Sequence, residues 1–168
     1  MEFKDDLWAD NHYEEEEIFC KFVEWIEDRI KKYPNLKIYH YAHYEKTSLL
    51  KSAQKFGKYE IEIDKWLNDD RLVDLYAVVR KAFIVGKDSY SIKRIEEVAG
   101  YKRELDLSSG MDSIFYFERY LTSGDIEEKE KLKNEILLYN KDDCYATEVV
   151  CNWLRKKQSE YDFIDTVS

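Results

Sequence analysis

Glycine and proline, the residues that interrupt helices and strands, are scarce in this sequence. It contains 5 glycines and 1 proline among 168 residues, a combined share of about 4 % where roughly 12 % is usual. Long uninterrupted elements are therefore predicted. No repeat, low-complexity tract or linker is found between these residues. They are Pro34, Gly57, Gly86, Gly100, Gly110 and Gly124. We expect one domain that spans residues 1–168.

The composition supplies a core and gives no sign of a membrane segment. Hydrophobic residues make up 44 % of the chain, with 8 Phe, 4 Trp and 14 Tyr among them, which excludes wholesale disorder. Apolar runs such as Leu75 to Val79 are far shorter than the roughly 20 residues of a bilayer span. The first residues, Met1 to Asp6, lack the basic start and apolar middle of a signal peptide. We expect a soluble, cytoplasmic protein with no membrane partner.

The chain is acidic, with 27 Lys and Arg against 36 Asp and Glu and a net charge of −9. This argues against binding of nucleic acid through a broad basic face, because such binding neutralises phosphates. It does not exclude a nuclease whose carboxylates hold a metal ion. The three cysteines form no CxxC pair, and we interpret Cys144 and Cys151 as small buried hydrophobes on a helix.

Hydrophobic spacing predicts a helix-rich α/β domain. The expected helices are Glu14–Tyr33, Lys46–Phe56, Tyr76–Ala82, Ser91–Ala99, Met111–Leu121 and a long one from Glu127 to about Lys156. The expected strands are Leu36–Tyr41 and Arg71–Leu75, with Phe3–Trp8 as a third candidate. Asn11 and Glu14 resemble a capping box for the first helix.

The last helix carries a carboxylate in the middle of its apolar stripe. At 100° per residue, the following positions fall within about 60° of one another: Leu132, Ile136, Tyr139, Asp143, Val150 and Leu154. An ionised Asp143 facing a core needs a partner or a metal ion. Tyr139 lies one turn earlier on the same face, near enough to share a water or substrate oxygen with it. A lysine, a backbone amide or a place at the edge of the stripe would satisfy Asp143 equally.

A second acid, Glu45, follows a predicted strand and opens a helix in the segment Tyr39-His-Tyr-Ala-His-Tyr-Glu45. Ligands of open α/β sheets bind at the carboxyl ends of strands. Two carboxylates from separate elements that meet there would suit Mg²⁺ or Mn²⁺ and metal-assisted phosphodiester hydrolysis. A zinc site shared by His40 and His43 is disfavoured, because their spacing on a strand points them to opposite faces.

These residues carry a resemblance to a known family. The segment Tyr139-Asn-Lys-Asp-Asp-Cys-Tyr-Ala-Thr147 resembles the YxxxD third motif of the DEDD 3′–5′ exonucleases. Together with YHYAHYEK and SYSIKRIEEVAG, it is similar to the YprB-like branch of the ribonuclease-H-like superfamily, over about residues 8–154. The resemblance implies a ribonuclease-H-like fold and a metal-dependent 3′–5′ exonuclease-like nuclease that acts on single-stranded DNA or RNA.

The resemblance also implies roles for individual residues. Glu45 takes the place of the second-motif acid and Asp143 that of the third-motif acid, both as ligands of Mg²⁺ or Mn²⁺. Tyr139 takes the place of the residue that orients the attacking water.

Three further residues have lesser roles by the same resemblance. Asp74 and Asp142 are expected to contact the metal ligands and not the metal ion itself. For Asp74, a purely structural role is the alternative. Lys93 is a candidate for contact with a substrate phosphate, with an ordinary surface lysine as the alternative.

The sequence departs from the family at its beginning. No D-x-E pair precedes the first helix, since Asp5, Asp6 and Asp10 have the wrong spacing, and Asp125-Ile-Glu127 comes too late. We expect an N-terminally truncated fold that lacks the first hairpin, so the two-metal mechanism does not transfer to this chain on its own. The uncovered sheet edge predicts self-association. The alternative function is a non-catalytic, degenerate binding or scaffolding module.

Overall fold

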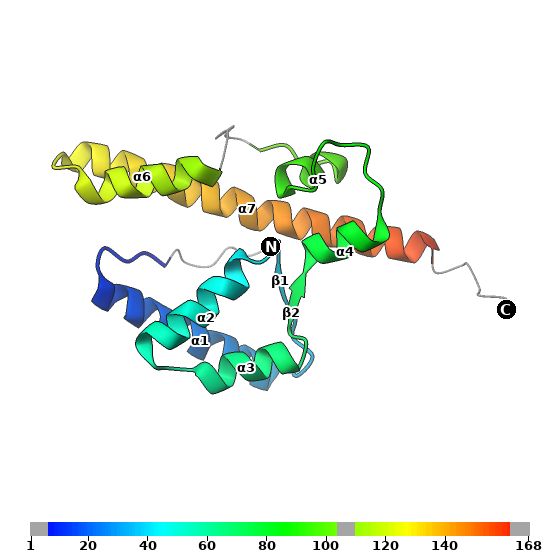
Figure 1. Ribbon diagram of the computed structural model, residues 1–168, viewed down its shortest axis with the longest axis horizontal. Helices are drawn as coiled ribbons and strands as arrows, with labels where there is room; N and C mark the ends of the chain where they lie inside the picture. The colour runs from blue at the N-terminus through cyan, green and yellow to red at the C-terminus, as the bar shows by residue number, and fades with distance from the viewer. Residues whose placement is uncertain (1–6, 104–109, 162–168) are drawn as a thin grey trace. The chain divides into compact units, whose positions relative to one another are not determined.

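The computed structural model of the protein describes residues 7–103 and 110–161 (Figure 1). The chain divides into two compact units, Met1–Asp74 and Leu75–Ser168, and each is described by itself. The expectation of one domain stays a prediction. Most of the candidate strand Phe3–Trp8 lies outside the described residues, and Leu7 and Trp8 belong to no strand.

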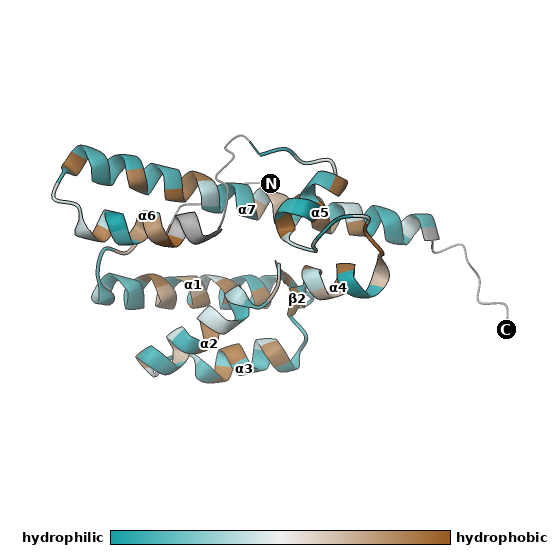
Figure 2. Cartoon of the chain, turned by 45° about the horizontal axis from the view of Figure 1, so that its top comes forward, coloured by the Kyte–Doolittle hydropathy of each residue, from teal (hydrophilic) through white to brown (hydrophobic). Residues whose placement is uncertain are grey.

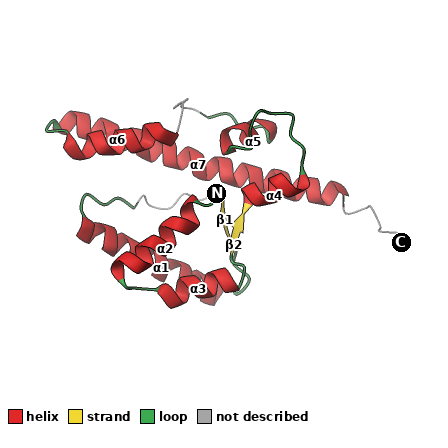
Figure 3. Cartoon of the chain, viewed as in Figure 1, coloured by secondary structure: helices red, strands yellow, loops and turns green. Residues whose placement is uncertain are grey.

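The described residues form a helix-rich α/β structure with two short strands, as expected from the sequence (Figure 3). The first unit contains α1 (His12–Lys32), β1 (Ile38–His40), α2 (Tyr44–Phe56), α3 (Glu60–Asn68) and β2 (Leu72–Asp74). The second unit contains α4 (Leu75–Ala82), α5 (Ile92–Val98), α6 (Gly110–Thr122) and α7 (Ile126–Tyr161). Helix α3 is the element that the sequence patterns did not predict.

The two strands pair in parallel, with Ile38 opposite Leu72 and His40 opposite Asp74. Parallel strands need a long crossover connection, and α2 and α3 provide it within the first unit. The carboxyl ends of both strands therefore lie at the same edge of the sheet, at His40 and Asp74. This is the edge where the sequence predicted a site.

Helix α1 begins at the predicted N-cap residue Asn11, and Glu14 completes a variant of the capping box in which it pairs with the residue before the cap. The side-chain oxygen of Asn11 accepts hydrogen bonds from the backbone N–H groups of Tyr13 and Glu14, at 3.1 and 3.0 Å. In turn, the Glu14 carboxylate accepts from the backbone N–H of Asp10 at 2.8 Å. Brown and teal residues alternate along α1 in Figure 2, which marks the helix as amphipathic.

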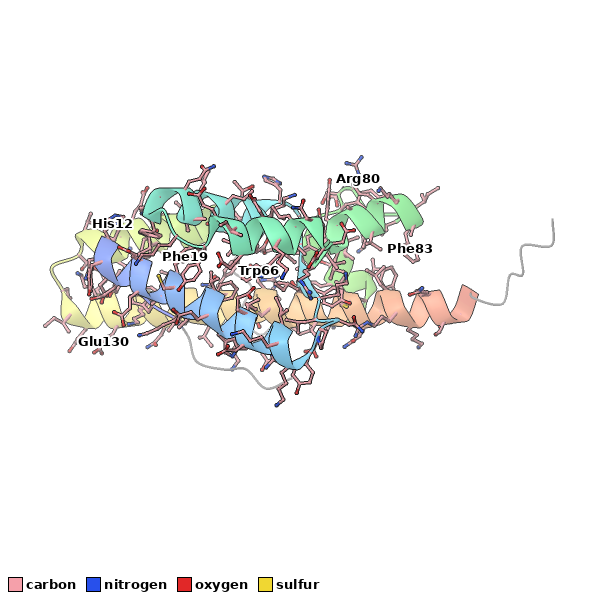
Figure 4. The ribbon with its side chains drawn as sticks, turned by 90° about the horizontal axis from the view of Figure 1, so that it is seen from below. His12, Phe19, Trp66, Arg80, Phe83 and Glu130 are labelled. Carbon is pink, nitrogen blue, oxygen red and sulfur yellow. The ribbon has the colours of Figure 1, made fainter. Side chains whose placement is uncertain are left out.

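The core of the first unit lies between α1 and the crossover helices. Its buried members are Phe19, Val23, Ile26, Ala53, Ile63 and Trp66. Figure 4 shows Phe19, on α1, and Trp66, on α3, in the space between these helices. The indole N–H of Trp66 donates to a carboxylate oxygen of Glu27 at 2.6 Å, so the largest fully buried side chain has its polar atom paired.

The unpredicted helix α3 has weak local signals. Tyr59 precedes it in the left-handed region, with φ +60°, and makes no side-chain cap. The helix has only 9 residues and buries only Ile63 and Trp66. A pattern this short fits a strand or a loop equally well, so its helical state depends on packing against α1 and α2.

Three shorter helices of the second unit, α4, α5 and α6, pack on the long helix α7. The buried positions of α7 follow the predicted stripe and include Leu132, Ile136 and Val150. Cys151 is buried as predicted, but Cys144 is exposed, so our interpretation of Cys144 as a buried hydrophobe is wrong. In the part of the chain that the structure describes, no helix is both long and apolar enough to span a membrane.

Candidate functional site

The sheet edge of the first unit is held by Asp74. One carboxylate oxygen of Asp74 accepts a hydrogen bond from the backbone N–H of Ala42 at 2.9 Å. Ala42 lies in the left-handed region, with φ +64°, which is strained for a residue with a side chain. The bond from Asp74 therefore fixes the tight turn that joins β1 to α2.

His40 and Glu45 lie at the same edge. His40 is buried, and its Nδ1 lies 2.6 Å from the carbonyl oxygen of Ala42. Because a carbonyl oxygen only accepts, this nitrogen carries the proton. Glu45 lies in the first turn of α2, half-exposed, with a carboxylate oxygen 3.9 Å from the same Nδ1. The edge thus presents one accessible carboxylate beside a buried imidazole.

In the second unit, Arg103 joins two carboxylates of different helices. Its Nε and Nη2 donate to the two carboxylate oxygens of Glu96, on α5, at 2.7 and 2.9 Å. The same Nη2 forms an ion pair with Oδ1 of Asp143, on α7, at 2.7 Å. The side chains of Arg103 and Glu96 are 8 % and 5 % exposed, and that of Asp143 is 36 % exposed. Asp143 therefore has the partner that its place in the apolar stripe required.

The guanidinium of Arg103 keeps its positive charge in spite of its burial. Burial alone would lower the pKa of Arg103, but its contacts with Glu96 and Asp143 outweigh burial and raise that pKa. The carbon of the guanidinium also lies 5.6 Å from the ring centre of Tyr139, within range of a cation–π contact. Arg103 thus links α5, the segment that follows it, and α7.

Tyr139 and Asp143 lie one turn apart on α7, and the charge of Asp143 acts on the Tyr139 hydroxyl. Burial raises the pKa of the Tyr139 hydroxyl, and the neighbouring charge of Asp143 raises it further. The phenol consequently stays protonated at neutral pH and acts as a hydrogen-bond donor. The Lys93 ammonium nitrogen lies 5.8 Å from the Tyr139 ring centre, which brings a second cation to this cluster.

Asp142 anchors the segment after α5. Its carboxylate accepts a hydrogen bond from the Tyr101 hydroxyl at 3.0 Å. Burial and this bond raise the pKa of Tyr101 to about 12. Asp142 therefore holds in place the backbone that carries Arg103 toward Asp143.

A half-open surface cavity of about 740 Å³ lies at α5 and its flanking segments. Its lining residues are Asp88, Ser89, Ser91, Lys93, Arg94, Glu96, Glu97, Tyr101, Lys102 and Arg103. Arg103 and Lys93 connect this cavity to Tyr139.

The structure brings four of the predicted site residues together within the second unit: Lys93, Tyr139, Asp142 and Asp143. The other two, Glu45 and Asp74, belong to the first unit. A metal site shared by Glu45 and Asp143 thus stays a prediction.

Sequence reasoning missed Glu96 and Arg103. The available signal was the same as for Asp143. Glu96 lies four residues after Ile92 and three before Ala99, so a carboxylate shares the apolar face of a helix. That pattern predicts that Glu96 needs a cationic partner. It cannot identify the partner, because Arg103 lies outside the helix.

The second unit does not fit a divalent metal ion as it stands. Among the residues that the structure describes, no three His, Cys, Asp or Glu side chains are grouped so as to hold one. Its two neighbouring carboxylates, Glu96 and Asp143, already share the positive charge of Arg103. Mg²⁺ and Mn²⁺ bind through carboxylates that carry free negative charge.

Comparison with known proteins identifies the class. The sequence matches the family described as the RNase H superfamily over residues 3–155. The chain belongs to this superfamily. No curated protein and no solved structure shows significant similarity to the chain. Membership indicates a nuclease-like or otherwise nucleic-acid-related function, in a class of enzymes that generally uses divalent metals.

Proposed function

We propose that this chain is a nuclease domain that hydrolyses phosphodiester bonds of single-stranded nucleic acid, in the manner of the 3′–5′ exonucleases. The observation that carries the proposal is the pair formed by Tyr139 and Asp143 on α7, within a cluster that reaches a cavity through Lys93 and Arg103. By the resemblance to the YxxxD motif, this tyrosine would orient the attacking water and this carboxylate would be the third-motif acid.

Each residue of the cluster has a task in this proposal. The protonated Tyr139 hydroxyl donates a hydrogen bond to the attacking water or to a phosphate oxygen. The Asp143 carboxylate, about one-third exposed, takes the place of the third-motif acid, which would hold a metal ion beside the phosphate. Lys93 lines the cavity and supplies positive charge for the phosphate backbone. Asp142 holds the segment after α5 through Tyr101.

The cofactor and its ligands are also proposals. We propose Mg²⁺ or Mn²⁺, with Glu45 and Asp143 as the carboxylates that would hold it, once Asp143 is released from its ion pair with Arg103. Asp74 is proposed to support Glu45 by fixing the turn that precedes α2.

The test is hydrolysis of end-labelled single-stranded DNA and RNA by the full chain, with Mg²⁺, with Mn²⁺ and with a chelator. Asp143→Asn is expected to reduce hydrolysis to background, and Tyr139→Phe to slow it. Glu130→Gln is the matched control, because it removes a carboxylate from an exposed position of the same helix. Labels at the two ends report polarity. Full hydrolysis by Asp143→Asn would refute the proposal.

A non-catalytic binding module is the second candidate. The observation that favours it is the ion pair of Asp143 with the buried Arg103, which leaves no free carboxylate pair in the described cluster. This function predicts binding of labelled single strands, measured by fluorescence anisotropy in the presence of a chelator, and no hydrolysis with either metal. Hydrolysis that Asp143→Asn abolishes would exclude it. Self-association through the strand edge belongs to either proposal, and light scattering at increasing concentration would detect it.

A further inference from the structure

Arg103 occupies a position between two carboxylates that come from different helices. One nitrogen, Nη2, lies 2.9 Å from Oε2 of Glu96 and 2.7 Å from Oδ1 of Asp143. The Arg103 side chain is 8 % exposed, so water weakens these interactions little. A single buried positive group therefore serves two negative groups at once.

A divalent cation would compete for the same oxygens. Mg²⁺ and Mn²⁺ take carboxylate oxygens as ligands, and Asp143 offers Oδ1 to the guanidinium instead. Arginine does not give way by losing its proton, because its guanidinium stays charged throughout the physiological range. A metal ion at Asp143 therefore requires the guanidinium to move away, and three short contacts of Arg103 oppose that movement.

We propose that Arg103 is the resident cation of the carboxylate pair Glu96 and Asp143, and that it keeps divalent metal ions off Asp143 in the resting protein. The inference deepens the proposed function, since it assigns a regulatory role at the same site. It rests on that function only for the consequence that displacement of Arg103 precedes hydrolysis. The metal affinity of Asp143 is thus set by a residue that no catalytic motif of the sequence contains.

A second contact in the same unit keeps Arg103 close to Asp143 even when their ion pair is broken. Tyr101, two residues earlier, is tied to Asp142 on α7 by a 3.0 Å hydrogen bond. Asp142 and Asp143 are adjacent, so this bond keeps the segment that bears Arg103 beside its partner. The restraint lowers the entropy lost when the ion pair forms again.

The experiment is a calorimetric titration of the metal-free full chain with Mn²⁺. In the wild type, we expect no stoichiometric site that depends on Asp143, so wild type and Asp143→Asn give the same isotherm. Arg103→Gln is expected to gain one site per chain, at least about tenfold tighter than any wild-type site, because a buried charge is removed. The double variant Arg103→Gln/Asp143→Asn is expected to lack that site. Lys102→Gln, which removes an exposed neighbouring cation, is expected to behave like the wild type.

Two results would overturn the inference. The first is a stoichiometric Mn²⁺ site in the wild type that Asp143→Asn abolishes. The second is an Arg103→Gln variant with wild-type circular dichroism and no gain in Mn²⁺ affinity. If Arg103→Gln fails to fold, a wild-type Mn²⁺ site that Asp143→Asn abolishes still overturns the inference.

The same variants separate this inference from the proposed function. If Arg103→Gln binds Mn²⁺ through Asp143 but cleaves no nucleic acid, the role of Arg103 holds and the nuclease function fails. If the wild type cleaves nucleic acid and also binds Mn²⁺ through Asp143 in the absence of nucleic acid, the nuclease function holds and the role of Arg103 fails.

Discussion

Removal of the Arg103 side chain is expected to lower the free energy of unfolding, and the contacts of Arg103 indicate by how much. Glu96 is 5 % exposed, and both of its carboxylate oxygens are hydrogen-bonded to Arg103. Arg103→Gln leaves that carboxylate buried and without its cation. Breaking a buried ion pair from one side costs about 3–5 kcal/mol. We expect the free energy of unfolding of the second unit to fall by that amount.

Removal of the other partner is expected to cost less. Glu96→Gln keeps Arg103 paired with Asp143 at 2.7 Å, so only the charge-assisted hydrogen bonds to Glu96 are weakened, worth about 1–3 kcal/mol. The double variant Arg103→Gln/Glu96→Gln is expected to be more stable than the sum of the single losses predicts, because two neutral amides replace the pair. A larger loss of stability for Arg103→Gln than for Glu96→Gln indicates that Arg103 pairs with two carboxylates. A simple pair of Arg103 with Glu96 would give similar losses for the two variants.

Urea denaturation followed by far-ultraviolet circular dichroism measures these differences, with a fit that allows the two units to unfold separately. Lys157→Gln is the control, because its ion pair with Glu160 is solvent-accessible, and no resolvable change is expected. An Arg103→Gln variant as stable as the wild type would refute the reasoning. So would equal losses for the two single variants.

Two smaller predictions concern the capping box and a buried phenol. Asn11→Ala removes the acceptor of two backbone N–H groups at the start of α1 and is expected to destabilise the first unit by about 1 kcal/mol in the same urea experiment; an unchanged midpoint would contradict it. The pKa of Tyr101 is raised from 10.0 to about 12 in the folded protein, so its stabilising contribution is complete below pH 10 and is lost as the pH rises through 12. Tyr101→Phe is expected to flatten the fall of stability over that interval, and a phenolate absorbance titration without a late-titrating tyrosine would contradict it.

The sequence located most helices because their signals are local. In α1, the apolar period, the cap at Asn11 and the basic last turn all agree. In α2, the left-handed Gly57 ends the helix where the pattern stops. For α3 no local signal was strong enough, and its burial of Trp66 against α1 is a tertiary effect.

The sequence predicted two residues of the candidate cluster, Tyr139 and Asp143, and missed two others. The position of Asp143 on the apolar stripe of α7 predicted a partner, and the motif predicted Tyr139 beside it. The structure places both residues one turn apart on α7, where burial and the charge of Asp143 raise the pKa of the Tyr139 hydroxyl. It also identifies the partner as Arg103, which the sequence patterns did not single out, and adds Glu96 as the third member.

The sequence by itself determined where the breakers fall, which helix faces are apolar and that a carboxylate on such a face must be paired. These properties depend on neighbours within a few residues, which the helical period brings together. Only the tertiary structure decided which cation pairs with Asp143, because that choice depends on how α5 and the segment after it pack on α7. The scarce glycines permit the long α7, and its packing turns one acid on that helix into a site.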